Sequence, residues 1–231
     1  MAPAGDIGMD TAELSALSAH LEQEGAAAAI RWAVDRFGSA VALACSFQDC
    51  VIVDLATRVD PGLEVVFLDT GFHFPETLQF VEQVRSRYNL NLTVTSPDAS
   101  AAAWPCGTSE CCQRRKVEPL FRALQGKEAW LTGLKRCDAS TRSNTPVLAW
   151  DQTRRMFKVN PLAAWSDDDI TRYISDHDLP VHPLIAKGYL SIGCAPTTRP
   201  VTRLPQQVGE GLAKSAKRWA NWFKPSRACS A

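Results

Sequence analysis

The chain contains 231 residues, of which 45% are hydrophobic and 22% are charged, and its 25 basic and 25 acidic side chains give a formal net charge of zero. This composition is typical of a globular protein with a hydrophobic core, and it excludes disordered and fibrous proteins. No zinc-finger, RNP-type or helix-turn-helix signature is present, so we expect no nucleic-acid partner.

The start of the chain carries Asp6 and Asp10 and has neither a basic segment nor an apolar run. We therefore predict no signal peptide and no transmembrane helix, and expect a cytoplasmic protein that does not bind a membrane. Eight cysteines are present. In a reducing compartment, clustered cysteines more often bind metals or act in catalysis than form disulfides.

The first half of the chain alternates between short apolar runs and segments of helical periodicity, which is typical of an α/β fold. An Ala-rich segment over residues 11–37 predicts one or two helices that end at Gly38. The first three strands are predicted at residues 41–45, 64–68 and 92–95. Helices are predicted between them, over residues 49–59 and 76–88.

The second half predicts one more strand, a hairpin and a helix. Residues 129–133 form a fourth apolar run. A polar stretch over residues 151–155 separates two strand-like segments, so it predicts the turn of a hairpin between residues 147–150 and 156–159. Ser166, with Asp169 three residues later, is typical of a capping box that begins a helix.

Three loops follow predicted strands, at residues 46–49, 69–71 and 133–142. In an open parallel sheet, ligands bind beyond the carboxyl ends of the strands, so these loops are candidates for a binding site. The first loop precedes a helix and could hold a phosphate or sulfate on its backbone N–H groups, although it lacks the glycines of a Walker loop. An ordinary turn with Asp49 as helix cap is the alternative.

A longer polar segment follows the second predicted strand and reads Leu68-Asp69-Thr70-Gly71-Phe72-His73-Phe74-Pro75-Glu76-Thr77. It resembles the adenine-nucleotide α-hydrolase-like superfamily, which includes the assimilatory sulfonucleotide reductases and the small subunit of ATP sulfurylase. Further motifs occur in the order seen in assimilatory adenylyl-sulfate (APS) reductases, and the likeness covers about residues 40–200. They are Glu110–Val117, Thr132–Arg136 with Ser140–Arg142, Lys158–Leu162 and Gly188–Cys194.

The resemblance implies a three-layer α/β fold of the adenine-nucleotide α-hydrolase-like type, with a mostly parallel twisted sheet flanked by helices. We expect a single sulfonucleotide reductase domain over residues 1–231. Its parts would be a helical segment over about 1–38, a nucleotide-binding core over 39–196 and a mobile basic tail over 197–231. From Arg199 onward the tail has seven basic residues and one acidic residue, so it either stays solvated or closes over an anionic ligand.

In the APS reductases, an adjacent cysteine pair and a later C-x-x-C motif bind a [4Fe–4S] cluster. Cys111, Cys112 and Cys194 match three of these positions, but Thr197 stands at the fourth, and iron–sulfur chemistry rarely uses a hydroxyl. The open position could stay solvent-exposed or take a displaced thiolate such as Cys106 or Cys137. A labile cluster, or none, is the other alternative. We expect three further cysteines to be small buried hydrophobes, namely Cys45, Cys50 and Cys137.

Several cations are candidates for binding the anionic groups of a substrate. The resemblance implies that Lys116 lies between cluster and substrate, although a solvent-facing lysine is the alternative. Arg142 follows a strand-end loop, where a guanidinium can bind phosphate or sulfate bidentately. Lys135 is a weaker candidate. The residues expected to bind the substrate are Ser46, Phe47, Gln48, Asp49, Leu68, Asp69, Thr70, Gly71, Lys116, Gly133, Arg136, Arg142 and Lys158.

Breaking the sulfate–AMP anhydride at sulfur requires a soft nucleophile, and a thiolate meets this need. In the family, a cysteine near the C-terminus attacks sulfur to give an S-sulfocysteine, and thioredoxin or glutaredoxin then releases sulfite. Cys229 has the comparable position and is the candidate catalytic residue, although it lacks the flanking E-C-G-L/I-H sequence of the family. A drifted tail on a chain that binds nucleotide without turnover is the alternative.

We therefore predict a thioredoxin-dependent APS reductase of sulfate assimilation. A reductase of 3′-phosphoadenylyl sulfate (PAPS) is the runner-up, because that branch of the family has no cluster and Thr197 replaces a ligand here. A nucleotide-binding redox sensor is an alternative of another class. The ATP sulfurylase small subunit is a weaker rival, since it would not explain the paired cysteines. The sequence leaves open whether the chain forms a homo-oligomer.

Overall fold

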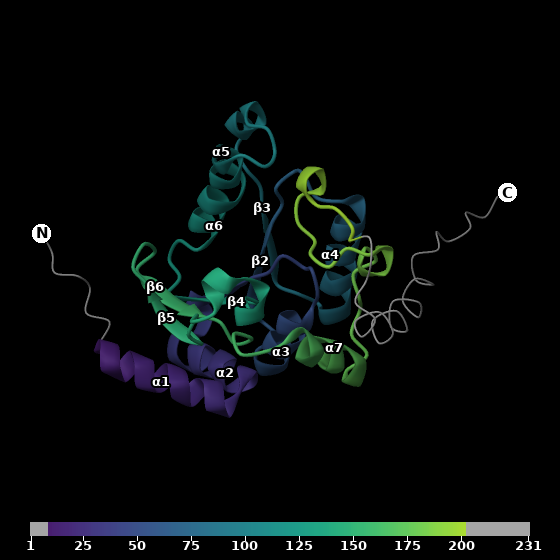
Figure 1. Ribbon diagram of the computed structural model, residues 1–231. Coiled ribbons are helices and arrows are strands. Elements are labelled where there is room, and N and C mark those ends of the chain that lie inside the picture. The colour runs from purple at the N-terminus through teal and green to yellow at the C-terminus, as the bar shows by residue number, and fades with distance from the viewer. Residues whose placement is uncertain (1–8, 202–231) are drawn as a thin grey trace, which may run out of the picture.

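A computed structural model describes residues 9–201 of the protein (Figure 1). Its centre is a six-stranded sheet with the order β3-β2-β1-β4-β6-β5. All neighbouring strands pair in parallel except β5, which is antiparallel to β6. The strands are β1 (Val41–Ala44), β2 (Glu64–Leu68), β3 (Leu92–Thr95), β4 (Ala129–Thr132), β5 (Leu148–Asp151) and β6 (Met156–Val159). The mostly parallel sheet and the β5–β6 hairpin are confirmed.

One face of the sheet carries the main hydrophobic core. In β1, Val41 and Leu43 are at most 1% exposed, as expected for a central parallel strand that is covered by helices. The helices that bury their apolar sides in this core lie below and beside the sheet in Figure 1. They are α1 (Thr11–Glu24), α2 (Ala26–Phe37), α3 (Val51–Val59), α4 (Pro75–Tyr88) and α7 (Asp167–Asp176).

The ends of these helices follow from local chemistry. Ser166 and Asp169 form the predicted capping box of α7, and Asp10 and Glu13 form another at the start of α1. α4 begins with Pro75, whose fixed φ suits the first helical turn. α3 begins at Val51, two residues later than the sequence predicted, although Asp49 Oδ1 still accepts a hydrogen bond of 2.9 Å from the Val51 N–H.

The opposite face is covered by a second helical layer, so the three-layer arrangement is confirmed. This layer consists of α5 (Ser109–Cys112), the π-helical turn η3 (Gln113–Val117) and α6 (Glu118–Ala123). It covers a smaller core around Val66, Leu124 and Trp130. Short 3-10 turns complete the described chain: η1 (Gly38–Ala40), η2 (Ala99–Ala103), η4 (Arg136–Asp138), η5 (Ser140–Arg142), η6 (Ile185–Lys187) and η7 (Ala195–Thr197).

None of the helices within residues 9–201 combines the length and the apolar composition that crossing a bilayer would require. The helices instead present their apolar residues to the two cores on either side of the sheet.

Candidate functional site

The topology of the sheet creates a crevice beside the carboxyl end of β1. From β1 the chain proceeds to β2 and β3 on one side, whereas β4 and β6 lie on the other side. The loops after β1 and β4 therefore diverge, and ligands of open α/β sheets bind at such switch points. A pocket of about 680 Å³ opens here, which we call the strand-end pocket. Its lining includes Ser46, Phe47, Gln48, Asp49, Gly133, Arg142 and Lys158.

The loop after β1 is shaped by a strained residue. Phe47 has a φ of 55°, in the left-handed region that non-glycine residues rarely adopt. Its ring is fully buried and lies edge-on against Phe67, with 5.6 Å between the ring centroids. This packing offsets the backbone strain at Phe47. The preceding residue, Ser46, stays exposed at the wall of the pocket. Strain of this kind is often found at binding sites.

Gln48 joins the loop after β1 to the C-terminal part of the described chain. Its side-chain oxygen accepts a hydrogen bond of 3.1 Å from the Ile192 N–H. Leu190 and Ser191 also line the strand-end pocket. The segment that carries Cys194 is therefore held against the first strand-end loop.

The strand-end pocket is lined on the β4–β6 side by two cations, Arg142 and Lys158. Burial lowers the pKa of Lys158, and the positive charges of Arg154 and Arg142 lower it further, against the opposing effect of Asp151. The Lys158 ammonium lies 5.0 Å from the centroid of the Trp130 ring. An anionic ligand would relieve the repulsion between these cations, so the pocket suits phosphate or sulfate groups.

Lys135 also lines this pocket, and its ammonium is already paired. It lies 2.5 Å from Asp167 Oδ1 and 3.2 Å from Asp138 Oδ1. Burial opposes the charge of Lys135, but the two carboxylates outweigh it, and the pKa of this lysine is raised. Lys135 therefore stays charged at the rim and fixes the loop after β4 to the start of α7.

A possible metal site lies at the same rim. The ligand atoms of Cys137, Asp138 and Asp167 lie within 4.8 Å of one another, and all three residues are exposed. A set of two carboxylates and one thiol does not suit an iron–sulfur cluster, which takes thiolates. The rim group is therefore distinct from the cysteines that the sequence predicted as cluster ligands.

Arg136 is predicted to bind the substrate, but it lines neither of the pockets described here. Its two terminal nitrogens donate to the two carboxylate oxygens of Glu22 in α1, at 2.7 and 2.6 Å. Its Nε donates to the Thr145 carbonyl at 2.8 Å. The hydrogen bonds from Arg136 also lower the pKa of Glu22. Arg136 therefore ties the loop after β4 to α1, and Glu22 is a partner that sequence reasoning missed.

A second pocket of about 240 Å³ adjoins the first on the other side of β1, and we call it the thiol-side pocket. Both pockets share Ala44, Cys45 and Ser46 as lining residues. The predicted site residues that line the thiol-side pocket are Ser46, Leu68, Thr70, Lys116 and Cys194. These five residues come from four predicted segments, so the structure brings the four segments together at one edge of the sheet.

Asp69 and Gly71 lie in the turn beside this pocket without lining it. Asp69 Oδ1 accepts a hydrogen bond of 2.9 Å from the Gly71 N–H. Gly71 has a φ of +71°, and a Cβ at this position would lie 3.2 Å from an Arg115 nitrogen. The turn therefore requires glycine, and its role is to shape the wall that Thr70 provides.

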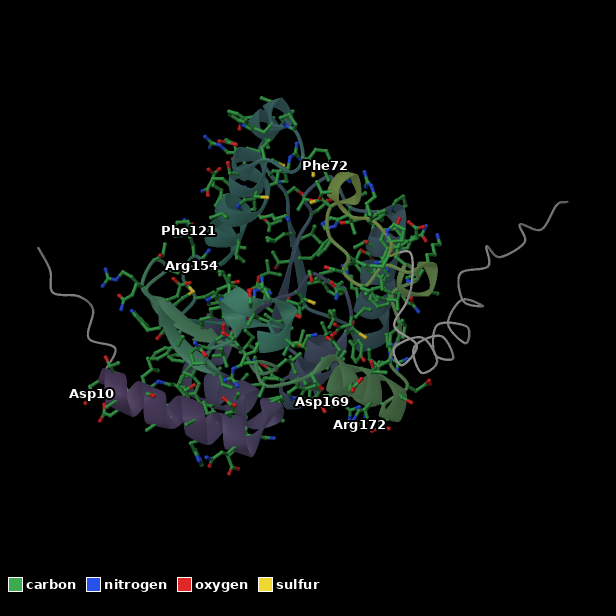
Figure 2. The ribbon with its side chains drawn as sticks, in the orientation of Figure 1. Asp10, Phe72, Phe121, Arg154, Asp169 and Arg172 are labelled. Atoms are coloured by element: carbon green, nitrogen blue, oxygen red, sulfur yellow. The ribbon has the colours of Figure 1, made fainter. Side chains whose placement is uncertain are left out.

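Arg115 is a residue whose role sequence reasoning missed. Its terminal nitrogens donate to the Thr70 and Ala101 carbonyls, at 2.8 and 2.9 Å. Its guanidinium carbon lies 4.3 Å from the centroid of the Phe72 ring. Figure 2 labels Phe72 between the α5 layer and the segment that contains η7. Arg115 thus joins the α5 layer to the loop after β2 and to η2. Its position close to the cysteine pair in the sequence was the available signal.

The cysteines predicted as cluster ligands lie where this layer meets the Cys194 segment. Cys111 and Cys194 are buried, at 3% and 7% exposure, and Cys112 is half-buried. The Cys194 thiol lies 3.5 Å from the Thr70 hydroxyl. Thr197 follows in η7 with its hydroxyl donating to the Cys194 carbonyl at 3.2 Å. Lys116 lines the thiol-side pocket together with Cys194. A thiol beside a cation fits an anionic iron–sulfur group, because cations stabilise thiolates.

The remaining cysteines differ in their surroundings. Cys45 and Cys50 are buried as predicted, and burial raises the pKa of the Cys45 thiol to about 12. The prediction for Cys137 was wrong: this thiol is exposed, because it lies in a turn at the pocket rim rather than in the core. Cys229 lies outside the described residues.

Comparisons with known proteins agree with this geometry. Residues 39–200 match the phosphoadenosine phosphosulfate reductase domain family. The chain is 40% identical to an adenosine 5′-phosphosulfate reductase of Mycobacteroides abscessus, over 86% of this chain and 89% of that protein. It is 39% identical to the Streptomyces coelicolor protein of the same name, over 93% of each chain.

Solved structures show the same fold. The phosphate complex of phosphoadenylyl-sulfate (PAPS) reductase from Candida auris has a TM-score of 0.73 and 27% identity, over 84% of this chain and 100% of that chain. FMN adenylyltransferase from Candida glabrata, with FAD and pyrophosphate, has a TM-score of 0.62 over 97% of this chain and 81% of that chain. Its 16% identity shows a likeness of fold alone. The predicted fold class is confirmed.

Proposed function

Because this chain belongs to the phosphoadenosine phosphosulfate reductase family, we propose that it reduces adenylyl sulfate (APS) to sulfite and AMP. The observation that carries the proposal is the pair of adjoining pockets on either side of β1. One contains the cations Arg142 and Lys158, and the other contains Lys116 and the Cys194 thiol. Relatives named adenosine 5′-phosphosulfate reductase, at about 40% identity over most of the chain, support APS as substrate.

Binding of the nucleotide relies on the strand-end loops. Arg142 and Lys158 would bind its anionic groups, and an anion beside Lys158 would favour the charged form that burial now disfavours. Ser46 lines both pockets, so the loop after β1 would contact the substrate where the two pockets meet. Lys116 would bring a positive charge to the sulfate end.

The chemical steps would use the thiol of Cys229. Its thiolate attacks the sulfur of APS, a sulfur–sulfur bond forms, and the bond from sulfur to the bridging oxygen breaks with AMP as leaving group. A thiol of reduced thioredoxin or glutaredoxin then attacks the Cys229 sulfur, and sulfite leaves with the electron pair. The second thiol of the donor restores Cys229 and leaves the donor as a disulfide.

A cytoplasmic location suits this chemistry. The seven cysteines that the structure describes are all free thiols, and a reducing compartment preserves free thiols. The same compartment would supply the reduced dithiol donor that the second step requires.

Cys111, Cys112 and Cys194 would hold the [4Fe–4S] cluster that the family implies. When bound, the cluster supplies a compact anionic iron–sulfur centre beside the thiol-side pocket. Arg115 and Lys116 lie in the same stretch of chain as the cysteine pair and would balance its charge. The presence of these three cysteines favours APS over PAPS.

One observation favours the second candidate, a PAPS reductase. Thr197 stands where the cluster-type enzymes have their fourth cysteine, and its hydroxyl is a poor iron ligand. An enzyme that binds no cluster would tolerate the loss of this cysteine. The choice between the two substrates is therefore decided by a direct comparison of their rates.

The test is sulfite release from APS and from PAPS with reduced thioredoxin. We expect the value of kcat/KM to be roughly ten-fold or more higher for APS. A Lys158→Gln variant should lower kcat/KM for APS roughly ten- to hundred-fold, as the loss of a charge-assisted contact does. The matched control is Lys127→Gln, because Lys127 pairs with Glu64 at the far end of the sheet, at 2.8 Å. A preference for PAPS would contradict the proposal.

A further inference from the structure

We propose that Cys106 supplies the fourth thiolate of the iron–sulfur site, in place of the residue at position 197. This inference rests on the proposed function, because it concerns the cluster that the family implies. Figure 1 shows the two segments involved, α5 with the turn before it and the chain around η7, approaching each other above the sheet.

Thr197 does not fit as an iron ligand. Its hydroxyl donates to the Cys194 carbonyl at 3.2 Å, so it serves the local turn. That turn is fixed from outside, because the Ala195 N–H donates to the Phe72 carbonyl at 2.7 Å. Position 197 therefore corresponds to a ligand position of the family but offers no thiolate. The three cysteines leave one iron of a four-iron cluster without a soft ligand.

Cys106 lies in the turn that leads into α5. Thr108 organises this turn: its hydroxyl donates to the Pro105 carbonyl at 3.1 Å and accepts from the Cys111 N–H at 3.1 Å. Thr108 is the N-cap of α5, which carries Cys111 and Cys112. The turn and the cysteine pair therefore form one local unit, and Cys106 is held at a fixed offset from that pair.

This turn packs directly against position 197. Gly107 has a φ of +101°, and a Cβ added there would lie 3.0 Å from the Thr197 methyl group. Cys106, one residue earlier, therefore occupies the space beside the missing ligand. Its half-buried side chain is in a position to take the place that a cysteine at 197 would fill.

The Cys106 thiol also contacts the other cysteines of the site. It is hydrogen-bonded to the Cys194 thiol and to the Thr197 hydroxyl, and it lies within electrostatic reach of Cys111. Thiols from two separate segments of the chain therefore meet beside position 197, as the ligands of a shared cluster would.

The other candidate, Cys137, is placed elsewhere. It lies at the rim of the strand-end pocket, and its thiol donates to the Trp165 carbonyl at 3.4 Å. Its nearest ligating partners are the carboxylates of Asp138 and Asp167. The structure therefore separates the two thiols that the sequence left as alternatives and favours Cys106.

The test measures iron and acid-labile sulfide per chain, with Mössbauer spectra, in protein purified without oxygen. We expect about four irons per wild-type chain and the spectrum of a four-iron cluster. The Cys106→Ala variant should contain about three irons or fewer and lose that spectrum, because one iron has no thiolate. The double variant Cys106→Ala with Thr197→Cys should regain both, which shows that the single variant fails through the missing ligand and not through misfolding.

Cys137→Ala is the matched control and should keep the wild-type iron content. Unchanged iron and an unchanged four-iron spectrum in Cys106→Ala would overturn the inference. A wild-type chain that releases sulfite from APS but contains no iron would also overturn it, while leaving the proposed function intact. An iron-loaded wild-type chain that releases no sulfite from APS would instead contradict the proposed function alone.

Discussion

His182 shows how burial sets the properties of a single residue. The ring is fully buried and packs against Phe80, with 5.1 Å between the ring centroids. Its Nδ1 accepts a hydrogen bond from the Leu184 N–H at 3.2 Å, so Nε2 carries the proton and donates to the Thr77 hydroxyl at 3.0 Å. Burial lowers the pKa of His182 to about 4, and the ring is neutral in the folded protein at neutral pH.

This pKa predicts an acid-sensitive fold. The folded-state value lies below the unfolded value of about 6.5, so the unfolded chain binds the proton more tightly and protonation favours unfolding. The stability that the neutral His182 ring gives the folded protein is fully present above about pH 6.5 and is lost as the pH falls toward 4. Between about pH 7 and about pH 5, the free energy of unfolding should fall by roughly 2 kcal/mol from this group.

Urea titrations of the wild type and of His182→Gln at the two pH values test this. The variant should be less stable near pH 7, because it lacks the packed imidazole ring. Its free energy of unfolding should, however, fall by roughly 2 kcal/mol less than that of the wild type between the two pH values. An equal pH dependence in both proteins would show that His182 does not carry the effect.

At the residue scale, sequence reasoning selected residues that stand in motifs and missed those that act through distant partners. Arg142, Lys158 and Cys194 were predicted because they follow strands or lie in a recognisable motif, and the structure places them at the two pockets. Glu22 was missed because its partner, Arg136, lies 114 residues away in the chain. Such pairings depend on tertiary packing, and no local pattern reports them.

At the scale of elements, the tie between α1 and the loop after β4 connects the N-terminal helix to the candidate site. Glu22 accepts hydrogen bonds from the two terminal nitrogens of Arg136. The turn η4 begins at Arg136, and the next turn, η5, ends at Arg142. A bidentate pair of this kind fixes the relative orientation of the guanidinium and the carboxylate, in addition to the attraction between their charges. α1 therefore helps to position the loop that carries a pocket cation.

Removing this tie should weaken substrate binding more than it slows turnover. In a Glu22→Gln variant the loop loses its anchor, so we expect KM for APS to rise several-fold with kcat nearly unchanged. Steady-state sulfite release measures both constants. Glu24→Gln, an exposed position on the same helix, is the control. If the two variants share the wild-type KM, Glu22 has no positioning role.

The elements themselves were largely predictable. The four parallel strands predicted as apolar runs appear within a residue of their expected ends, because each is buried on both faces or paired at an edge. The π-helical turn η3 and the short 3-10 turns were not predicted, since segments of three to five residues show no periodicity. These unpredicted turns carry Arg115, Arg136 and Thr197, which is why their contacts were the hardest to foresee.

For the whole molecule, the order of the strands explains why separate motifs meet. Parallel strands share a carboxyl edge, so the loops after β1, β2 and β4 had to lie together, and this could be inferred from sequence. The division into two pockets could not be inferred, because it depends on the central place of β1 between β2 and β4. The proposed reaction needs both pockets, one for the nucleotide and one for the sulfur chemistry.

The most direct test of this account is the mass of the protein after incubation with APS in the absence of any reductant. The wild type should gain about 80 Da, the mass of one sulfo group, on the peptide that contains Cys229, and Cys229→Ser should gain nothing. The absence of this adduct from the wild type, or its presence on another cysteine, would contradict the proposed attack of Cys229 on the bound sulfonucleotide.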